Sequence, residues 1–289
     1  QDPALSTPDG LPPLRDVIRG LDLSARRSLG QNFLLDFNLT RRIARAGGPL
    51  EGTTIVEIGP GPGGLTRALL LEGAVHVVAI EKDRRCLPAL TDIAAAYPGR
   101  LEIVEADALE IDYAKLNLAP PCRIVANLPY SVATPLLIGW LKTSPWPPWF
   151  DRLVLMFQRE VAERIVAKPG RKDYGRLSVI AQWRTESRIL FGVPARAFTP
   201  VPKVDSSLVE LVPKAEPAPP CDIAVLEKVT AAAFGQRRKM LRSSLRQITP
   251  DAEALLNSLD IAPTARAEEL EVADFARLAN ALGRRAPNT

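Results

Sequence analysis

The sequence is poor in the residues that build metal sites and disulfide frameworks. It has three cysteines, Cys86, Cys122 and Cys221, which lie far apart and include no CxxC pair. An odd number of distant cysteines argues against a disulfide framework or a cysteine zinc site and fits a reducing compartment. The single histidine, His76, excludes a multi-histidine metal site or a catalytic histidine dyad within the chain. We therefore expect a cytoplasmic protein without a bound metal.

Long apolar runs are also missing, although 46% of the 289 residues are hydrophobic. No stretch reaches the roughly 18–20 apolar residues that a membrane span requires, so no membrane partner is expected. The apolar content is enough for one large and one small domain, each with its own core. The net charge of +4 is mild. The distribution of basic residues therefore says more about nucleic-acid binding than their total.

Short apolar runs alternate with helical patterns through the first two-thirds of the chain. This alternation is typical of an α/β protein in which helices cover both faces of a parallel sheet. We expect strands over residues 54–58, 75–80, 101–104, 123–126, 152–157 and 206–212. We expect helices over residues 36–46, 65–71, 84–96, 134–141 and 160–167. Residues 198–202 are expected to form a rigid turn.

Proline-rich stretches suggest the domain boundaries. Residues 1–23 are expected to be a flexible leader, and residues 24–212 the α/β domain. The four prolines within residues 213–220 indicate a linker. After it the patterns predict only helices, over residues 223–234, 237–246, 252–259 and 272–282, in a small domain of residues 221–289. Nothing in the sequence demands more than a monomer.

A glycine-rich loop follows the first expected strand of the sheet and opens a helix, where doubly wound folds bind nucleotides. Gly59, Gly61 and Gly64 have the GxGxxG spacing. This spacing alone leaves a dinucleotide-dependent enzyme open. Pro60 and Pro62 argue against it, because they lack the amide N–H groups that a pyrophosphate needs. S-adenosylmethionine has no phosphate and tolerates their loss.

Acidic residues stand at the ends of the first three expected strands. Glu81 ends the second strand, and its carboxylate can accept hydrogen bonds from both ribose hydroxyls of an adenosyl cofactor. Asp107 follows the third strand, where it can accept from the adenine amine. Glu57, in the first strand, either contacts the methionine part of the cofactor or braces the loop. The carboxyl ends of such strands form the crevice in which ligands bind.

The tetrapeptide Asn127-Leu128-Pro129-Tyr130 follows the fourth expected strand. Adenine N6 is a poor nucleophile because its lone pair is delocalised into the ring. The Asn127 amide oxygen and the Leu128 carbonyl, fixed by Pro129, could accept its two hydrogens and draw the nitrogen toward tetrahedral geometry. Tyr130 could stack on the target base. In isolation the tetrapeptide is equally compatible with a plain turn; its place in the sheet favours methyl transfer to adenine.

Five separate segments, in this order, resemble the ribosomal RNA adenine N6,N6-dimethyltransferases, the KsgA family. They are SLGQNFL at 28–34, VEIGPG at 56–61, NLPY at 127–130, FTPVPKVDS at 198–206 and QRRKML at 236–241. The resemblance covers residues 24–282 and implies a Rossmann-like class I methyltransferase sheet with a small all-helical C-terminal domain. The substrate it implies is a pair of adjacent adenines near the 3′ end of small-subunit (16S) rRNA. Each adenine would be methylated twice on the immature small ribosomal subunit.

The resemblance also implies which residues line the site for S-adenosylmethionine. Without it, residues 30–34 would predict only a loop before a helix, with Phe33 and Leu34 as a core anchor. We expect Gly61 and Ala108 beside the residues that the family indicates. Those are Asn32, Leu34, Gly59, Glu81, Asp107 and Asn127.

Basic residues cluster in three places that we expect to contact RNA phosphates. Within ten residues the chain carries Arg237, Arg238, Lys239, Arg242 and Arg246, with no acidic residue among them. On a helix, positions 238, 242 and 246 would share a face. A second cluster surrounds a glycine in an expected loop and comprises Lys168, Arg171, Lys172 and Arg176. The third is the pair Arg26 and Arg27.

Three other functions remain open at this point. A large-subunit rRNA methyltransferase of the antibiotic-resistance type would share the chemistry, but the 198–206 and 236–241 segments favour the small-subunit enzyme. A ribosome-assembly factor with weak catalysis would not need Asn127 and Tyr130. An NAD-linked oxidoreductase is disfavoured by the prolines of the glycine loop.

Overall fold

A computed structural model describes residues 7–21 and 31–285 of the chain. The chain divides into two compact units. Unit 1 comprises Gln1–Gly139, Pro148–Ala162 and Ile189–Glu210. Unit 2 comprises Trp140–Pro147, Glu163–Arg188 and Leu211–Thr289.

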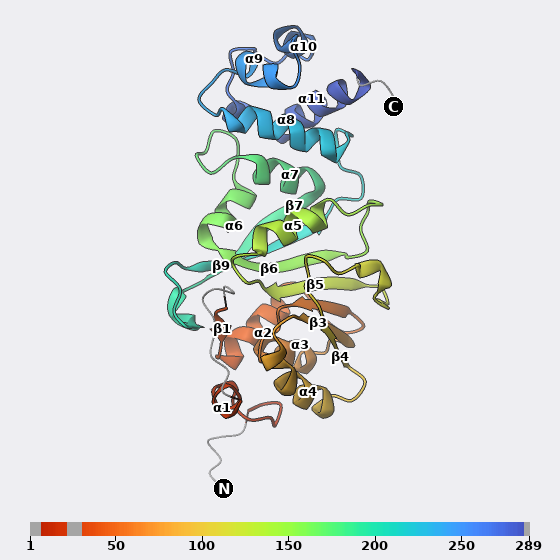
Figure 1. The fold of residues 1–289 in the computed structure, drawn as a ribbon, viewed down its shortest axis with the longest axis vertical. Coiled ribbons are helices and arrows are strands. Elements are labelled where there is room, and N and C mark those ends of the chain that lie inside the picture. Colours follow the sequence, from red (N-terminus) through yellow and green to blue (C-terminus); the bar gives the residue numbers. More distant parts are fainter. Residues whose placement is uncertain (1–6, 22–30, 286–289) are drawn as a thin grey trace. The chain divides into compact units, whose positions relative to one another are not determined.

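A seven-stranded sheet has the order β4-β3-β2-β5-β6-β9-β7 (Figure 1). Strand β2 pairs in parallel with β3 on one side and with β5 on the other, and the pairs β3–β4 and β5–β6 are also parallel. The chain therefore changes direction across the sheet between β2 and β5, at the kind of switch point where α/β folds bind ligands. The strands are β2 (Thr54–Ile58), β3 (His76–Glu81), β4 (Leu101–Glu105), β5 (Cys122–Asn127), β6 (Arg152–Gln158), β7 (Thr185–Val193) and β9 (Ser206–Pro213).

Helices connect the parallel strands, as the alternating pattern predicts. Helix α3 packs against β3 and α4 against β4. Asp36 caps α2 by accepting from the backbone N–H groups of Asn38 and Leu39. The predicted α/β fold is confirmed, with every expected strand present. The helices are α2 (Phe37–Ala46), α3 (Gly64–Leu71), α4 (Leu87–Ala96), α5 (Ala133–Leu141) and α6 (Arg159–Val166), with the 3-10 turns η3 (Arg84–Cys86) and η4 (Tyr113–Lys115).

Two short strands join distant parts of unit 1. Strand β1 (Phe33–Leu34) pairs antiparallel with β8 (Phe198–Thr199), so that Leu34 stands opposite Phe198. Both side chains are buried and belong to the same apolar cluster. Residues 198–199 were expected in a rigid turn, but they form this strand, which follows the 3-10 turn η5 (Ala195–Ala197). The pairing brings the 31–34 segment and the 198–206 segment together.

The expected flexible leader contains regular structure. Helix α1 (Leu14–Gly20) begins after Pro13, and its Leu14 is buried. Asp9, ahead of the helix, forms an ion pair with Arg67 of α3. The prediction of flexibility is therefore wrong for this part, because its anchors lie about fifty residues away along the chain. Residues 1–6 and 22–23 of the expected leader lie outside the described residues.

Unit 2 holds three of the four helices that the sequence predicts after the proline-rich stretch, and part of the fourth. It also holds α7, which was not expected and follows the basic loop around Gly170. The expected linker lies against other parts of this unit, since Trp183 Nε1 donates to the Pro219 carbonyl at 2.8 Å. None of the helices in residues 7–21 and 31–285 is both long and apolar enough to cross a membrane. The helices are α7 (Arg176–Arg184), α8 (Ile223–Gly235), α9 (Leu241–Ser244), α10 (Ala252–Ser258) and α11 (Val272–Arg285), with the turns η6 (Leu245–Gln247) and η7 (Ala267–Glu269).

The helix predicted over residues 237–246 is found only in its second half, as α9 (Leu241–Ser244) followed by the turn η6 (Leu245–Gln247). Residues 236–239 form a turn, and Met240 is extended, with φ −64° and ψ 148°. Tertiary hydrogen bonds override the helical propensity here, because the Leu241 N–H donates to the Ala265 carbonyl and the Arg242 N–H to the Pro263 carbonyl. The argument that residues 238, 242 and 246 share one helical face therefore fails.

Candidate functional site

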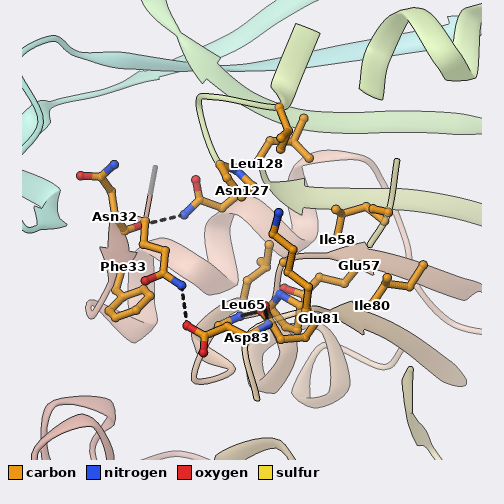
Figure 2. A pocket seen from close by; sticks show the side chains of 18 of the residues that line it. Asn32, Phe33, Glu57, Ile58, Leu65, Ile80, Glu81, Asp83, Asn127 and Leu128 are labelled. Atoms are coloured by element: carbon orange, nitrogen blue, oxygen red, sulfur yellow. Dashed lines mark hydrogen bonds between the residues drawn. The ribbon is translucent and has the colours of Figure 1, made fainter. Parts of the chain in front are cut away.

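A hollow opens in unit 1 beside the carboxyl ends of β2, β3, β4 and β5. It encloses about 1020 Å³ of empty space, part of which is open to solvent. Figure 2 shows Asn127 and Leu128 on one side of it and Glu57, Glu81 and Asp83 on the other. The structure brings together every residue predicted for the cofactor and for catalysis. These are Asn32, Leu34, Gly59, Gly61, Glu81, Asp107, Ala108, Asn127, Leu128, Pro129 and Tyr130.

The backbone N–H groups of the glycine loop already donate hydrogen bonds to other groups of the protein. The Gly59 N–H donates to the Ile80 carbonyl at 2.9 Å, and the Gly63 N–H donates to the Pro60 carbonyl at 3.0 Å. The Gly61 N–H donates to Glu81 Oε2 at 2.9 Å. Since the two prolines of the loop carry no N–H, no backbone donor between residues 59 and 63 is left for a pyrophosphate. This geometry argues against a dinucleotide.

Two of these glycines have a backbone conformation that favours glycine and lie close to neighbouring segments. Gly59 has φ +62°, and a Cβ there would lie 3.4 Å from Pro129 Cδ. Gly61 has φ +57°, and a Cβ there would lie 3.3 Å from Cε1 of Phe33. A side chain at either position would strain the backbone, and at Gly61 it would also crowd the Phe33 ring. The glycine loop, the NLPY segment and β1 thus meet at one place.

Glu81 ends β3 with a side chain that is largely withdrawn from water. Its residue is 7% exposed, and its two oxygens accept from the Gly61 N–H at 2.9 Å and the Asp83 N–H at 2.8 Å. Burial raises the pKa of Glu81, and these backbone hydrogen bonds partly oppose the rise. Each carboxyl oxygen has a second lone pair, so Glu81 can still accept from a ligand hydroxyl.

Glu57 is buried deeper, at the point where β2 leads into the loop. It is 2% exposed, and it accepts a short hydrogen bond from the Thr66 hydroxyl of α3. Burial raises the pKa of Glu57 to about 8, with a smaller opposing effect from Thr66 and a further increase from the nearby Glu81. A carboxyl that is protonated near neutral pH is a poor partner for a charged methionine group. Of the two interpretations left open, the geometry favours bracing of the loop.

Asp107 and Ala108 form the edge of the hollow after β4. Asp107 Oδ1 accepts from the Leu109 N–H at 3.0 Å, while Oδ2 lies 3.7 Å from the Lys82 ammonium. The Ala108 carbonyl accepts from the Tyr113 hydroxyl at 3.1 Å. The Tyr113 ring stacks on Trp149, with ring centroids 5.3 Å apart. This aromatic support was not predicted, because the two rings are distant in sequence.

Asn127 is held in one orientation by the 31–34 segment. Its Nδ2 donates to the Asn32 carbonyl at 3.1 Å (Figure 2). A carbonyl can only accept, so this bond assigns the amide nitrogen to Asn32 and turns Oδ1 the other way. No other described residue donates a hydrogen bond to Oδ1. It is therefore an available acceptor at the end of β5, beside the buried Leu128.

Tyr130 is held by a residue that was not predicted as part of the site. Its hydroxyl lies 2.6 Å from the hydroxyl of Ser206, which is fully buried at the start of β9. Burial raises the pKa of Tyr130, so the phenol stays protonated near neutral pH. With its hydroxyl held, the half-buried ring has a fixed position. The 198–206 segment thus supports the site, although only the family resemblance had drawn attention to it.

A second unpredicted group is the acid two positions after Glu81. Asp83 accepts from Gln31 Nε2 at 2.9 Å and from an Arg85 guanidinium nitrogen at 2.6 Å. These bonds, chiefly that from Arg85, lower the pKa of Asp83 to about 2 against the effect of burial. Asp83 therefore fastens the 31–34 segment to the end of β3. The Asp-x-Arg spacing of residues 83–85 was the sequence feature that could have indicated a bonded aspartate here.

The RNA-contact residues predicted within residues 237–246 lie in unit 2 and divide into two kinds. Arg237 is used within the unit, since its guanidinium donates to the carbonyls of Tyr174 and Arg171 and to Glu268. That arrangement does not favour an RNA contact by Arg237. Arg238, Lys239 and Arg246 are exposed and Arg242 is half-buried. The second cluster is exposed and follows α6 as expected, with Arg176 opening α7; Arg26 and Arg27 lie outside the described residues.

Comparisons with known proteins show the family of the chain. Residues 22–283 match the model of the family described as ribosomal RNA adenine dimethylase. A ribosomal RNA small subunit methyltransferase A of Azorhizobium caulinodans is 63% identical over 280 residues, which cover 97% of this chain and 96% of that protein.

Two solved structures are also similar. A dimethyladenosine transferase from Plasmodium falciparum has a TM-score of 0.72 and 25% identity, covering 86% of this chain and 96% of that one. The 23S rRNA methyltransferase ErmE has a TM-score of 0.65 and 28% identity, covering 87% of this chain and all of that one. The family match spans both compact units and every motif described above. The chain belongs to the ribosomal RNA adenine dimethylase family.

Proposed function

We propose that the protein transfers methyl groups from S-adenosylmethionine to N6 of two adjacent adenines near the 3′ end of small-subunit rRNA. Each adenine receives two methyl groups, and the substrate is the immature small ribosomal subunit. The main observation that supports this proposal is the orientation of Asn127, whose Oδ1 is left as an acceptor at the end of β5. The 63% identical relative, named for the small subunit, supports this target over large-subunit rRNA.

The hollow fits an adenosyl cofactor without phosphates. Glu81 has lone pairs left for two ribose hydroxyls, and Asp107 has a carboxyl oxygen turned away from its own turn. The backbone N–H groups of residues 59–63 already donate hydrogen bonds within the protein, which suits a ligand that carries no pyrophosphate. When bound, S-adenosylmethionine would supply a methyl group on a sulfonium. The residues holding it would be Asn32, Leu34, Gly59, Gly61, Glu81, Asp107, Ala108 and Asn127.

The NLPY segment would activate the adenine amine. Asn127 Oδ1 and the Leu128 carbonyl accept hydrogen bonds from the two N6–H groups. These bonds localise the nitrogen lone pair and stabilise the growing positive charge. Tyr130, fixed through Ser206, stacks on the base. Bound S-adenosylmethionine would supply the methyl group and leave as the thioether, and N6 would lose one proton to water for each methyl group that it gains. No strong general base is required, because the methylated ammonium is acidic.

RNA phosphates would be contacted by the exposed cations of unit 2. Arg238, Lys239, Arg242 and Arg246 remain in this proposal, whereas Arg237 is assigned to the structure of the unit. Such contacts set affinity and register rather than the choice of base. We further propose that the protein acts as a monomer.

The test is methyl transfer from labelled S-adenosylmethionine to small ribosomal subunits that lack adenine dimethylation, followed by mass analysis of the rRNA 3′ region. Two dimethyladenosines in that region are expected. Label on large-subunit rRNA instead would establish the alternative target. Tight subunit binding without any methyl transfer would establish a role in assembly alone.

A further inference from the structure

The first described segment of the chain, residues 7–21, borders the hollow at the strand ends. Leu14 opens α1, lines the hollow and is 8% exposed. Within α1 it alone is buried. Its Cδ2 lies 3.0 Å from the position that a Cβ on Gly64 would take. Leu14 therefore packs on the first residue of α3, the helix that the glycine loop opens.

A second hollow lies on the other side of this contact. It encloses about 440 Å³ of empty space, part of it open to solvent. Leu14, Leu34 and Gly64 line both hollows and thus form the partition between them. Because no side chain of the described residues fills the space behind Leu14, apolar packing among these residues does not by itself fix the segment in place.

Arg67 of α3 holds the segment by directed bonds. Its side chain is 2% exposed, and that of its partner Asp9 is fully buried. Two guanidinium nitrogens donate to the two carboxylate oxygens, both at 2.6 Å, and a third donates to the Pro12 carbonyl at 2.7 Å. This bidentate geometry restricts both distance and angle. Pro12 lies two residues before Leu14, so the bonds control where Leu14 enters the hollow.

The segment around Asp9 is shaped to present its carboxylate. Asp9 Oδ1 accepts from the Thr7 hydroxyl at 2.8 Å and from the Leu11 N–H at 3.1 Å. Burial acts to raise the pKa of Asp9, but the bonds from Arg67, Thr7 and Leu11 outweigh it and lower the pKa. A buried ion pair adds little net stability over apolar residues of equal volume. Fixing one geometry is the better explanation for its presence here.

We propose that Leu14 is part of the wall that binds the cofactor, and that Arg67 is a positioning residue that sets this wall through Asp9 and Pro12. The inference rests on the proposed binding of S-adenosylmethionine in the hollow. It adds a contact from residues that precede all the family motifs described above. The wall would supply apolar contact to the cofactor and exclude water at the glycine-loop side.

The test is the affinity of the purified full chain for S-adenosylmethionine, measured by calorimetry, together with steady-state methyl transfer. Leu14→Ala should raise the Kd of the cofactor about tenfold, since it removes apolar contact. The KM for the ribosomal subunit and the kcat at saturating cofactor should stay within twofold of wild type. Leu14→Met should retain wild-type affinity. Arg19→Ala is the matched control, because Arg19 lies on the same helix with its side chain 79% exposed.

Arg67→Met and Asp9→Asn test the positioning role. Both should raise the cofactor Kd by a similar factor without changing the KM for the subunit, and Tm is recorded for each variant. A fall in Tm with the cofactor Kd within twofold of wild type, in these variants and in Leu14→Ala, would overturn the inference. If wild type itself fails to bind S-adenosylmethionine, the proposed function fails instead. Should Leu14→Ala not fold, Leu14→Val is measured in its place.

Discussion

The polar side chains of the hollow and those of the basic stretch 236–246 are held in opposite ways. Around the hollow, Glu81, Asn127 and Tyr130 each have a bond within the chain that fixes the group and leaves another part of it available. In the basic stretch, the exposed side chains of Arg238, Lys239 and Arg246 have no hydrogen bond or ion pair within the described residues. Methyl transfer needs groups placed in advance, whereas a phosphate backbone accepts mobile cations. We therefore expect the hollow to set the rate of methyl transfer and the basic stretch to set the affinity for RNA.

The largest effect should come from the hollow. Asn127→Ala removes an acceptor aimed at the reacting nitrogen, so kcat should fall by about 10²–10³. Cofactor affinity should change far less, because Glu81 and Asp107 remain. The measurement is single-turnover methyl transfer beside calorimetric binding. Activity equal to wild type would remove Asn127 from the reaction.

Glu81→Ala should act on binding rather than on chemistry. Losing the hydrogen-bond acceptor for the ribose hydroxyls should weaken S-adenosylmethionine by about 10–100-fold, from roughly 1.5–3 kcal/mol for bonds to a charged group. At saturating cofactor, most of the kcat should return. The exposed Glu105→Ala, at the end of the neighbouring strand, serves as control. A Kd that does not change would contradict the assigned role.

Glu57 should affect stability in a way that depends on pH. An unfolded Glu57 would lose its proton near its ordinary value of 4.5, while the folded protein keeps it until about pH 8. Folding therefore takes up a proton between these values, and stability falls as pH rises through the window. Glu57→Gln should remove about 2 kcal/mol of this fall between pH 5 and 7. The free energy of unfolding of both proteins is measured by urea denaturation at several pH values. If it changes with pH equally in wild type and Glu57→Gln, the raised pKa of Glu57 is excluded.

The smallest effects should come from the basic stretch, where they separate two kinds of arginine. Arg238→Gln with Arg242→Gln should reduce the slope of log Kd for RNA against log salt by up to about 1.4–1.8, with Tm unchanged. Arg237→Met should leave this slope intact but lower stability by about 1–2 kcal/mol, since it strips bonds from Tyr174 and Glu268. Filter binding over a salt series and thermal unfolding distinguish them. Equal salt slopes in all variants would contradict the RNA-contact proposal.

The sequence predicts best what local pattern and strand register determine. The strand over residues 54–58 is found with those bounds. Glu81 and Asp107 line the same hollow because parallel strands end at one edge of the sheet. The sequence does not show bonds between distant segments. The support of Tyr130 by Ser206 and of Asn127 by the Asn32 carbonyl depends on tertiary pairing. The same reason explains why the first half of the helix predicted over residues 237–246 is missing, since tertiary bonds override local preference there.

The pairing of β1 with β8 has a consequence for biosynthesis. Leu34 finds Phe198 across more than half of the chain, and Tyr130 finds its hydrogen-bond partner only at Ser206. A nascent chain that ends before Phe198 can form β2, β3 and β4 but lacks β8, which pairs with β1, and Ser206, which holds the Tyr130 hydroxyl. Contacts of such sequence separation close slowly. We therefore expect the methylating centre to be completed late in translation, after β2, β3 and β4.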